Sequence, residues 1–416
     1  MSWQTVVGLL RNRALHATLA IQGLGSAATL LLGLLIAWSQ GPQAQGHYGV
    51  VRSTADLLVA ITLLGLPQGM VHLLNHERVR PQALQAGLTR YVCAVAALGL
   101  VLILSCDLGV LPEGLRQPGA ALALAAGVAG WTVQALQRSF VLCMGSTAAF
   151  SWLTAAPALT LLAAVLALLA CGSHRYEWAV AASGAASALW GAALVAPLRA
   201  QPAWRQGAAL PWRKLLAFGG HSTVQTVSLA LQPWLALSLL QRLSAAPVEL
   251  GWFVLAGYVH QLFALPANFV MPLLMARASK AAGSGQAYDV SHGMRVVGVL
   301  SLLSGVAVAT MLPIGVPLML GEDYRPAVAA CVCMAVAGPA VMMGRLASAQ
   351  MLGRGHFAAV SALFILRVGL MTLGIWLAGT GTLQLPLDRV TAAAAAWALA
   401  EIIVAACMLA SIRGFR

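Results

Sequence analysis

Two stretches of the chain share one pattern, Ser39-Gln-Gly-Pro-Gln-Ala-Gln-Gly-His-Tyr48 and Ser244-Ala-Ala-Pro-Val-Glu-Leu-Gly-Trp-Phe253. Each begins with Ser, has Pro three residues later and Gly four residues after the Pro, and ends with an aromatic residue. Because Pro and Gly mark particular backbone turns, the match indicates that one turn occurs twice. Sliding residues 16–70 by 205 positions onto 221–275 aligns 13 identical residues in 55 positions. The second half of the chain therefore repeats the first.

The composition places this repeat in a membrane. Of the 416 residues, 60% are hydrophobic and only 8% are charged, whereas an average soluble protein is about 25% charged. A membrane-spanning helix uses about 20 apolar residues, which leaves room for roughly ten to twelve spans. This excludes a soluble enzyme, a disordered chain and a single-span receptor, and it predicts an all-α, polytopic membrane protein.

Apolar runs separated by short polar or Gly/Pro breaks predict twelve transmembrane helices. Helices are expected because backbone groups in lipid must be hydrogen-bonded within their own segment. The tightest predicted turns are Cys143-Met-Gly-Ser146 and Gly353-Arg-Gly355. The predicted spans are 14–38, 51–74, 86–106, 119–143, 147–171, 177–198, 213–241, 249–275, 292–318, 327–350, 356–379 and 390–411.

Six spans separate the two copies of the repeat, so both copies have the same orientation in the membrane. We therefore expect two pseudo-symmetric six-helix bundles, residues 1–205 and 206–416. Transporters with internal repeats bind their substrate at the interface between the repeats and work by alternating access. The repeat thus favours a transporter, and a duplication without a transport role is the alternative.

The strong positive charge is mostly a signal of orientation. The chain has 24 basic and 11 acidic residues, a net charge of +13, which in a soluble protein would suggest nucleic-acid binding. With a cytoplasmic N-terminus, the predicted spans place 17 basic residues on the cytoplasmic side and six on the other, and leave Arg367 inside a helix. Cytoplasmic loops of membrane proteins are enriched in Lys and Arg. We expect both termini in the cytoplasm, contact with membrane lipids and no nucleic-acid partner.

Catalytic and metal-binding signatures are absent from the sequence. It contains no P-loop and no His-Glu-x-x-His motif, and its seven cysteines lie in or beside apolar helices. An odd number of cysteines in such places does not indicate a disulfide framework. We therefore expect a protein that is not an enzyme and that uses no cofactor and no metal ion.

The first repeat also carries a family resemblance. Ser39 to Val50, followed by Leu64-Gly-Leu-Pro67, resembles the first loop and second helix of polysaccharide flippases, of the O-antigen flippase type. These proteins belong to the multidrug/oligosaccharidyl-lipid/polysaccharide exporter superfamily. Gly145 and Gly353-Arg-Gly355 resemble that family's short cytoplasmic turns. With the length, the twelve spans and the repeat, the resemblance covers nearly the whole chain.

The resemblance implies a V-shaped arrangement of two six-helix bundles in the bacterial inner membrane. It also implies movement of an undecaprenyl-pyrophosphate-linked oligosaccharide to the outer leaflet for surface polysaccharide and lipopolysaccharide biosynthesis, with polysaccharide polymerases as candidate partners. Two other functions remain open. One is a cation-coupled multidrug exporter of the same superfamily. The other is a membrane-bound polysaccharide polymerase or ligase, which typically needs a large polar loop that this chain lacks.

Ionisable residues within membrane spans are costly and mark candidate functional positions. Arg367 and Glu401 fall near the middle of adjacent predicted helices, where pairing would limit the cost of burying their charges. A structural pair is the first interpretation, and a coupling-ion or substrate role is the second. Arg52 and Asp56 lie one helical turn apart, so that they either pair or line the outward cavity. Asp56 is the candidate coupling site for a proton or another cation.

Polar side chains on two helices of the second half are candidate cavity residues. Along 213–241 they recur at spacings of three or four residues, on one face of the helix. A polar seam between packed helices would give the same pattern. The residues are His221, Gln225, Ser228 and Gln232, followed on the next helix by Gln261 and Asn268.

Arg138 and Arg345 end two helices that correspond under the repeat. Their depth near the inner mouth suits snorkelling of long basic side chains to the interface. It also suits recognition of the pyrophosphate of the lipid carrier, because a guanidinium binds phosphate through two parallel hydrogen bonds. His16 and His221, another repeat-related pair, would either join this cationic site or lie at the level of the lipid headgroups.

Overall fold

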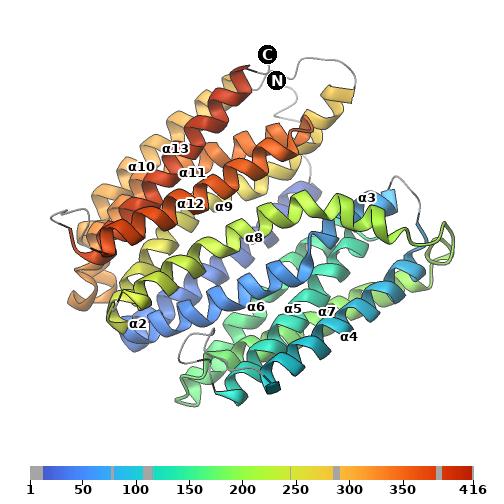
Figure 1. Cartoon of the computed structure of the whole chain (residues 1–416), viewed down its shortest axis with the longest axis horizontal. Coiled ribbons are helices and arrows are strands. Elements are labelled where there is room, and N and C mark those ends of the chain that lie inside the picture. Colours follow the sequence, from blue (N-terminus) through green and yellow to red (C-terminus); the bar gives the residue numbers. More distant parts are fainter. Residues whose placement is uncertain are drawn as a thin grey trace. The chain divides into compact units, whose positions relative to one another are not determined.

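The computed structural model describes residues 13–75, 79–105, 115, 117–243, 245–283, 291–380 and 387–414, and these are almost entirely helical (Figure 1). The helices are α2 (Arg13–Leu63), α3 (Leu66–Asn75), α4 (Pro81–Ser105), α5 (Pro118–Met144), α6 (Thr147–Ala170), α7 (Tyr176–Arg199), α8 (Trp212–Arg242), α9 (Pro247–Gly283), α10 (Ser291–Leu320), α11 (Ala327–Gly353), α12 (Phe357–Gly379) and α13 (Arg389–Gly414), with short 3-10 turns at Pro202–Trp204 and Glu322–Tyr324. This confirms the all-α prediction for the described part of the chain.

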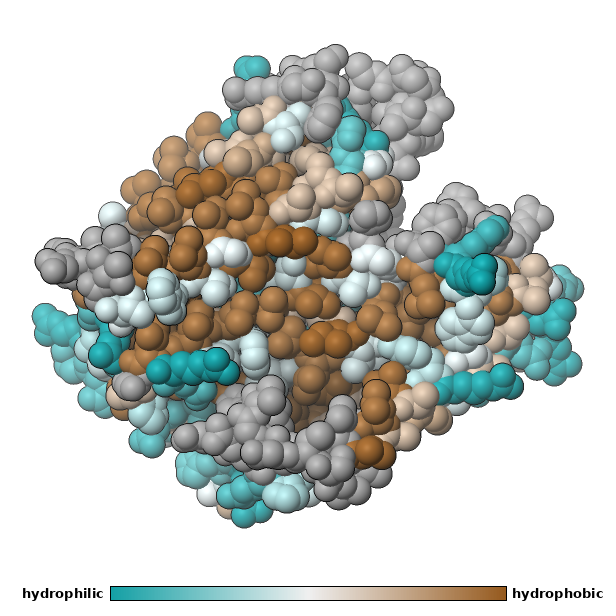
Figure 2. Space-filling view, in the orientation of Figure 1, coloured by the Kyte–Doolittle hydropathy of each residue, from teal (hydrophilic) through white to brown (hydrophobic). Residues whose placement is uncertain are grey.

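Ten of the described helices are long and apolar enough to cross a membrane. One of them, the kinked α2, covers the first predicted span and part of the second, which α3 completes. The third predicted span corresponds to α4. Each of the twelve predicted spans therefore corresponds to a helical segment, and the chain is a multi-pass membrane protein. Figure 2 shows hydrophobic residues over much of the visible face, with hydrophilic residues gathered toward helix ends. On α10, for example, Met311, Ile314 and Leu318 are 71–81% exposed, as expected of side chains that face lipid.

The turn between the first two spans is shorter than the sequence predicts. Residues 39–50 were predicted to be non-helical because they are polar and contain Gly and Pro, and this prediction is wrong for most of them. The helix is interrupted only at Gly41, whose backbone has φ 79° and ψ −177°. Because glycine adopts positive φ without a steric penalty, the chain reverses there. Pro42 then begins the next helix, where its missing N–H costs no hydrogen bond.

The second predicted span, 51–74, is also interrupted. α2 ends at Leu63 and α3 begins at Leu66, with positive φ at Leu64 (45°) and Gly65 (62°). A Cβ at Gly65 would lie 2.1 Å from the carbonyl oxygen of Gly219 on α8. The break thus allows two backbones to approach closely, which a continuous helix with side chains would prevent.

The two short turns predicted between spans are confirmed. Gly145 ends α5, and the Ser146 side chain caps α6 by accepting a hydrogen bond of 3.1 Å from the backbone N–H of Ala149. Such a cap satisfies one of the unpaired N–H groups at a helix start. After α11, Gly355 has φ 87°, and α12 begins two residues later.

Both halves of the chain repeat one packing pattern. α5 and α6 each pack against α7 in the first half, and α11 and α12 each pack against α13 in the second. α5 and α11 have the same length, 27 residues. Each half therefore places its last helix between two earlier ones, in agreement with the pseudo-symmetry that the sequence repeat predicts.

Backbone contacts group the chain into two compact units. One comprises residues 1–32 and 54–226, and the other comprises 33–53 and 227–416. The middle of α2 thus belongs to the same unit as α9–α13, and the first part of α8 belongs to the same unit as α3–α7. The predicted boundary at residue 205 describes the sequence repeat, and it remains a proposal about how the chain is divided.

Within the second unit, the two repeated turns pack against each other. A Cβ at Gly46 would lie 2.7 Å from the carbonyl oxygen of Pro247, and a Cβ at Gly251 would lie 1.9 Å from that of Pro42. Tyr48 and Phe253, the aromatic residues of the two patterns, are both buried. The glycines of the repeat are therefore needed because each helix start leaves no room for a side chain on the other.

Candidate functional site

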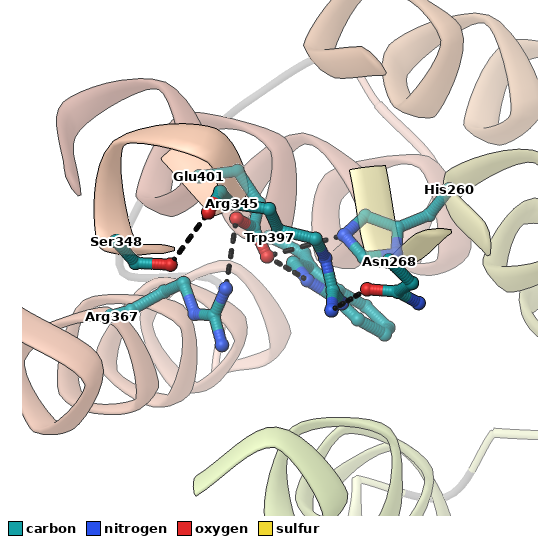
Figure 3. Close-up of polar contacts among 7 residues, drawn as sticks. All are labelled: His260, Asn268, Arg345, Ser348, Arg367, Trp397 and Glu401. Carbon is teal, nitrogen blue, oxygen red and sulfur yellow. Dashed lines mark hydrogen bonds and ion pairs between the residues drawn. The ribbon is translucent and has the colours of Figure 1, made fainter. Parts of the chain in front are cut away.

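A cluster of charged and polar side chains lies between helices of the second unit. Figure 3 shows that they come from four helices: His260 and Asn268 from α9, Arg345 from α11, Arg367 from α12, and Trp397 and Glu401 from α13. We call these six residues the C-terminal cluster. His260, Arg367 and Glu401 are each no more than 5% exposed, so the centre of the cluster is screened from its surroundings.

Glu401 is the hub of the cluster. Its Oε2 accepts a hydrogen bond of 3.2 Å from Nη1 of Arg367. Its Oε1 lies 3.2 Å from Nε2 of His260 and accepts a bond of 3.3 Å from the indole N–H of Trp397. A buried carboxylate is tolerated when opposite charge and hydrogen-bond donors replace its lost water. The structure thus brings together Arg367 and Glu401, the two residues that the sequence predicts as a pair.

Helical spacing explains how the hub is built. Trp397 and Glu401 are four residues apart on α13, so their side chains lie on one face of the helix. The imidazole of His260 lies beside the Trp397 ring, with centroids 5.0 Å apart, and the Arg367 guanidinium lies 4.6 Å from the centroid of Phe364. Aromatic faces attract cations, so the Arg367 guanidinium is also held by a ring, and His260, the other partner of Glu401, lies against one too.

Arg345 and Asn268 form the more open end of the cluster. Nη1 of Arg345 donates a hydrogen bond of 2.9 Å to Oδ1 of Asn268, and Ser348 donates one of 2.8 Å to the backbone oxygen of Arg345. Arg345 is half-buried and Asn268 is exposed. The sequence predicts both as cavity residues without indicating a contact between them, and the structure brings them together.

Positive charge exceeds negative charge in the cluster. The cluster holds two guanidinium groups and one carboxylate: Arg367 pairs with Glu401, whereas Arg345 donates to the neutral Asn268. Nε of Arg345 and both Nε and Nη2 of Arg367 are buried and have no hydrogen-bond partner in the part of the chain that the structure describes. Buried N–H groups without partners are costly, and an anion with several acceptor oxygens would satisfy them.

The first unit contains a related but simpler arrangement at Arg138. Its guanidinium carbon lies 5.8 Å from the centroid of the Phe150 ring, and the described residues provide no hydrogen bond or ion pair to it. Nearby on α5, Gln134 is buried and donates a hydrogen bond to the backbone oxygen of Leu153. Oε1 of Gln137 is buried and lacks a partner within the described ranges. Arg138 is thus a guanidinium without a carboxylate hub, on the helix that corresponds to the one carrying Arg345 and two positions away from an exact match under the repeat.

Other predicted site residues lie outside the cluster. Arg52 and Asp56 are half-buried on the second part of α2, and Gln225 is half-buried on α8. Ser228 and Gln232 are buried, at 6% and 2% exposure, which agrees better with a packed polar seam than with an open cavity wall. Gln261 is exposed on α9. The side chains of His16 and His221 lie outside the described residues.

Sequence reasoning missed His260. Histidine is ionisable, and an ionisable residue near the middle of a transmembrane helix is a candidate functional residue by itself. That rule identified Arg367 and Glu401, and applied to histidine it would also have identified His260. The four-residue spacing of Trp397 and Glu401 offers a second, weaker signal.

The fold resembles that of several solved transporters. An inward-facing multidrug resistance MATE family transporter of the MOP superfamily superimposes with a TM-score of 0.72, at 14% identity over 96% of this chain and 98% of that one. The lipid II flippase MurJ, in an inward closed conformation, gives a TM-score of 0.69 at 12% identity, over 95% and 86% of the two chains. The Vibrio cholerae MATE transporter VcmN in its bent form gives 0.60 at 15% identity, over 96% and 98%.

The chain has the fold of MATE transporters and MurJ. No protein-family model matches its sequence, and no curated protein is similar to it by sequence. At identities of 12–15% the resemblance establishes the architecture, namely two pseudo-symmetric helical halves that span the whole chain. What the protein does has to be inferred from its own residues.

Proposed function

We propose that this protein is a flippase that moves a lipid-linked oligosaccharide with an anionic diphosphate headgroup across the bacterial inner membrane by alternating access. The observation that carries the proposal is the charge of the C-terminal cluster, which has two arginines and one carboxylate and in which three guanidinium nitrogens lack partners among the described residues. A diphosphate offers the negative charge and the acceptor oxygens that such guanidinium groups bind best.

The repeat-related Arg138 supports the same substrate. It gives the N-terminal half a guanidinium that no carboxylate neutralises in the described structure, on the helix that corresponds to the one carrying Arg345. In this proposal the chain is divided into two halves, residues 1–205 and 206–416, and each half carries an arginine that can bind a diphosphate. The oligosaccharide is bound by neutral polar side chains such as Gln225 and Gln261, while the lipid tail stays in the bilayer.

The proposal also includes orientation and surroundings. Both termini are cytoplasmic, transport is coupled to a proton or another cation with Asp56 as a candidate, and polysaccharide polymerases that use the flipped product are candidate partners. The protein itself catalyses no covalent step and needs no cofactor. The fold shared with the lipid II flippase MurJ, whose name specifies a lipid-linked substrate, is consistent with this function.

A multidrug exporter is the second candidate, because MATE transporters share the fold at a TM-score of up to 0.72. The charge of the cluster argues against it. Cationic drugs need acidic residues in their site, whereas Glu401 is the only acid of the cluster and both of its oxygens already accept hydrogen bonds.

The test measures surface polysaccharide in a strain from which the gene is deleted and into which one variant of it at a time is reintroduced. Removing the guanidinium in Arg345→Gln or Arg138→Gln should lower surface polysaccharide about tenfold or more, because a charged hydrogen bond to the headgroup is lost. Lipid-linked glycan should accumulate on the cytoplasmic leaflet. The matched control is Arg325→Gln, at an exposed turn where Arg325 pairs only with Glu322, and it should export normally.

Two results would overturn the proposal. If both arginine variants made an unchanged amount of surface polysaccharide, the two arginines would not bind the diphosphate headgroup. Increased drug sensitivity of the deletion strain, without accumulation of lipid-linked glycan, would favour the multidrug exporter instead.

A further inference from the structure

His260 is the one group of the C-terminal cluster that ordinarily changes its charge near neutral pH. Its Nε2 lies 3.2 Å from Oε1 of Glu401. An ionised carboxylate can only accept a hydrogen bond, so Nε2 must carry the hydrogen. The other ring nitrogen, Nδ1, is then the atom that can take up a proton.

The groups in contact with His260 lie on α13. They are the negative Glu401 and the ring of Trp397, which lies beside the imidazole. Beyond Glu401, the positive Arg367 on α12 donates to the other carboxylate oxygen, and the positive Arg345 on α11 donates to the neutral Asn268 on α9 (Figure 3). With His260 neutral, the ionised groups carry one net positive charge, and with His260 protonated they carry two.

The hydrogen bonds of Glu401 leave little place for a metal cation. Hard cations are bound by several oxygen atoms with available lone pairs. Oε1 of Glu401 already accepts from His260 and Trp397, and Oε2 accepts from Arg367. All three are donors, and Arg367 also carries a positive charge that repels a cation. A proton on His260 is therefore the cation that this arrangement can accommodate.

We propose that His260 binds a proton together with the anionic headgroup, the proton on Nδ1 adding a positive charge that tightens anion binding at Arg345 and Arg367. Because linkage is reciprocal, the bound anion raises the affinity of His260 for the proton by the same factor. This inference rests on the proposed function and deepens it, because it names the proton as the coupled ion and places it in the C-terminal half rather than at Asp56.

The experiment measures binding of UDP-N-acetylglucosamine to the purified full-length protein by titration calorimetry. This soluble sugar diphosphate is a diester, so its charge does not change between about pH 5 and 8, the range in which histidine titrates. Titrations in two buffers of different ionisation enthalpy report how many protons are taken up. We expect the affinity to rise on the order of tenfold toward the acidic end, with net proton uptake on binding.

Two variants isolate His260. His260→Gln keeps an N–H donor for Glu401 but cannot be protonated, so its affinity should no longer depend on pH. The matched control is His174→Gln, in the exposed turn after α6, which should behave like the wild type. Asp56→Asn should keep the pH dependence.

The outcomes separate the inference from the proposed function. Binding by the wild type without proton uptake, or a pH dependence that persists in His260→Gln, would overturn the role of His260 and leave the flippase proposal intact. If the variant does not fold, proton uptake by the wild type decides alone. Absence of binding at every pH would overturn the anion site itself. Normal export by Arg345→Gln and Arg138→Gln would overturn the flippase proposal separately.

Discussion

Glu401 shows how a membrane protein keeps a carboxylate in its interior. One acid receives hydrogen bonds from an arginine, an indole and a histidine, on three helices. The arrangement orients Arg367 and His260 and partly neutralises the positive charge of the cluster. Removing the acid would therefore affect folding as well as transport.

We expect Glu401→Gln to destabilise the protein by about 3–5 kcal/mol, because it leaves Arg367 buried without a counter-ion. Thermal unfolding of the purified protein, followed by near-UV absorption or dye binding to cysteines, measures the change. The matched control is Glu322→Gln, whose pair with Arg325 is exposed and should contribute little. Equal unfolding temperatures for the two variants would contradict a structural role for Glu401.

Exchanging the charges by Arg367→Glu with Glu401→Arg should not restore stability. The N–H groups of His260 and Trp397 would then face a guanidinium, which has no acceptor atom. An isolated pair would tolerate the exchange, whereas a hub with three donors does not. Recovery of wild-type stability in the double variant would show that the pair acts alone.

At this scale the sequence predicts charges better than it predicts their partners. Arg367 and Glu401 could be paired because both are charged residues at similar depth in adjacent helices. The bond between Arg345 and Asn268 depends on how α9 and α11 pack, which no spacing within one helix indicates. His260 was missed although its position in a span was visible, because its contact with Glu401 joins residues 141 positions apart in the sequence.

At the scale of helices, Gly46 and Gly251 are the most informative residues of the repeat. Each lies against the backbone of the other repeated turn, so both copies of the pattern need a glycine at that position. The sequence could indicate that a turn occurs twice, but it could not indicate that the two turns meet. Polar residues such as Gln43 and Gln45 made the segment look like a loop. Gln45 is instead buried in a helix, where its Oε1 accepts a 2.7 Å hydrogen bond from Tyr324.

Gly251→Ala should destabilise the protein by about 1–3 kcal/mol, the usual cost of inserting a methyl group where there is no space. Its Cβ would be placed 1.9 Å from the carbonyl oxygen of Pro42. Gly257→Ala, on the same helix with nothing within 4 Å of the added Cβ, is the control and should be neutral or slightly stabilising. Comparable thermal unfolding of the two variants would mean that the two turns do not pack as described.

At the scale of the whole molecule, sequence and contacts divide the chain differently. Each apolar run that hydropathy identified as a span corresponds to a helical segment, because in lipid an apolar run of the right length has few alternatives to a helix. The repeat identified two halves of similar length. It could not predict that residues 33–53 would pack with the C-terminal helices and residues up to 226 with the N-terminal ones, since that depends on tertiary contacts and not on periodicity.

Orientation in the membrane gives a prediction for the whole chain. If the excess of basic residues marks the cytoplasmic side, the exposed turn after α6 faces outward and the turn before α8 faces the cytoplasm. In a variant that keeps only Cys171 of the seven cysteines, a membrane-impermeant maleimide should label intact cells. A variant whose only cysteine is Gln206→Cys, also at an exposed position, should be labelled only after the cells are permeabilised. The reverse pattern would place both termini outside. The anion would then have to reach the C-terminal cluster from the opposite side of the membrane.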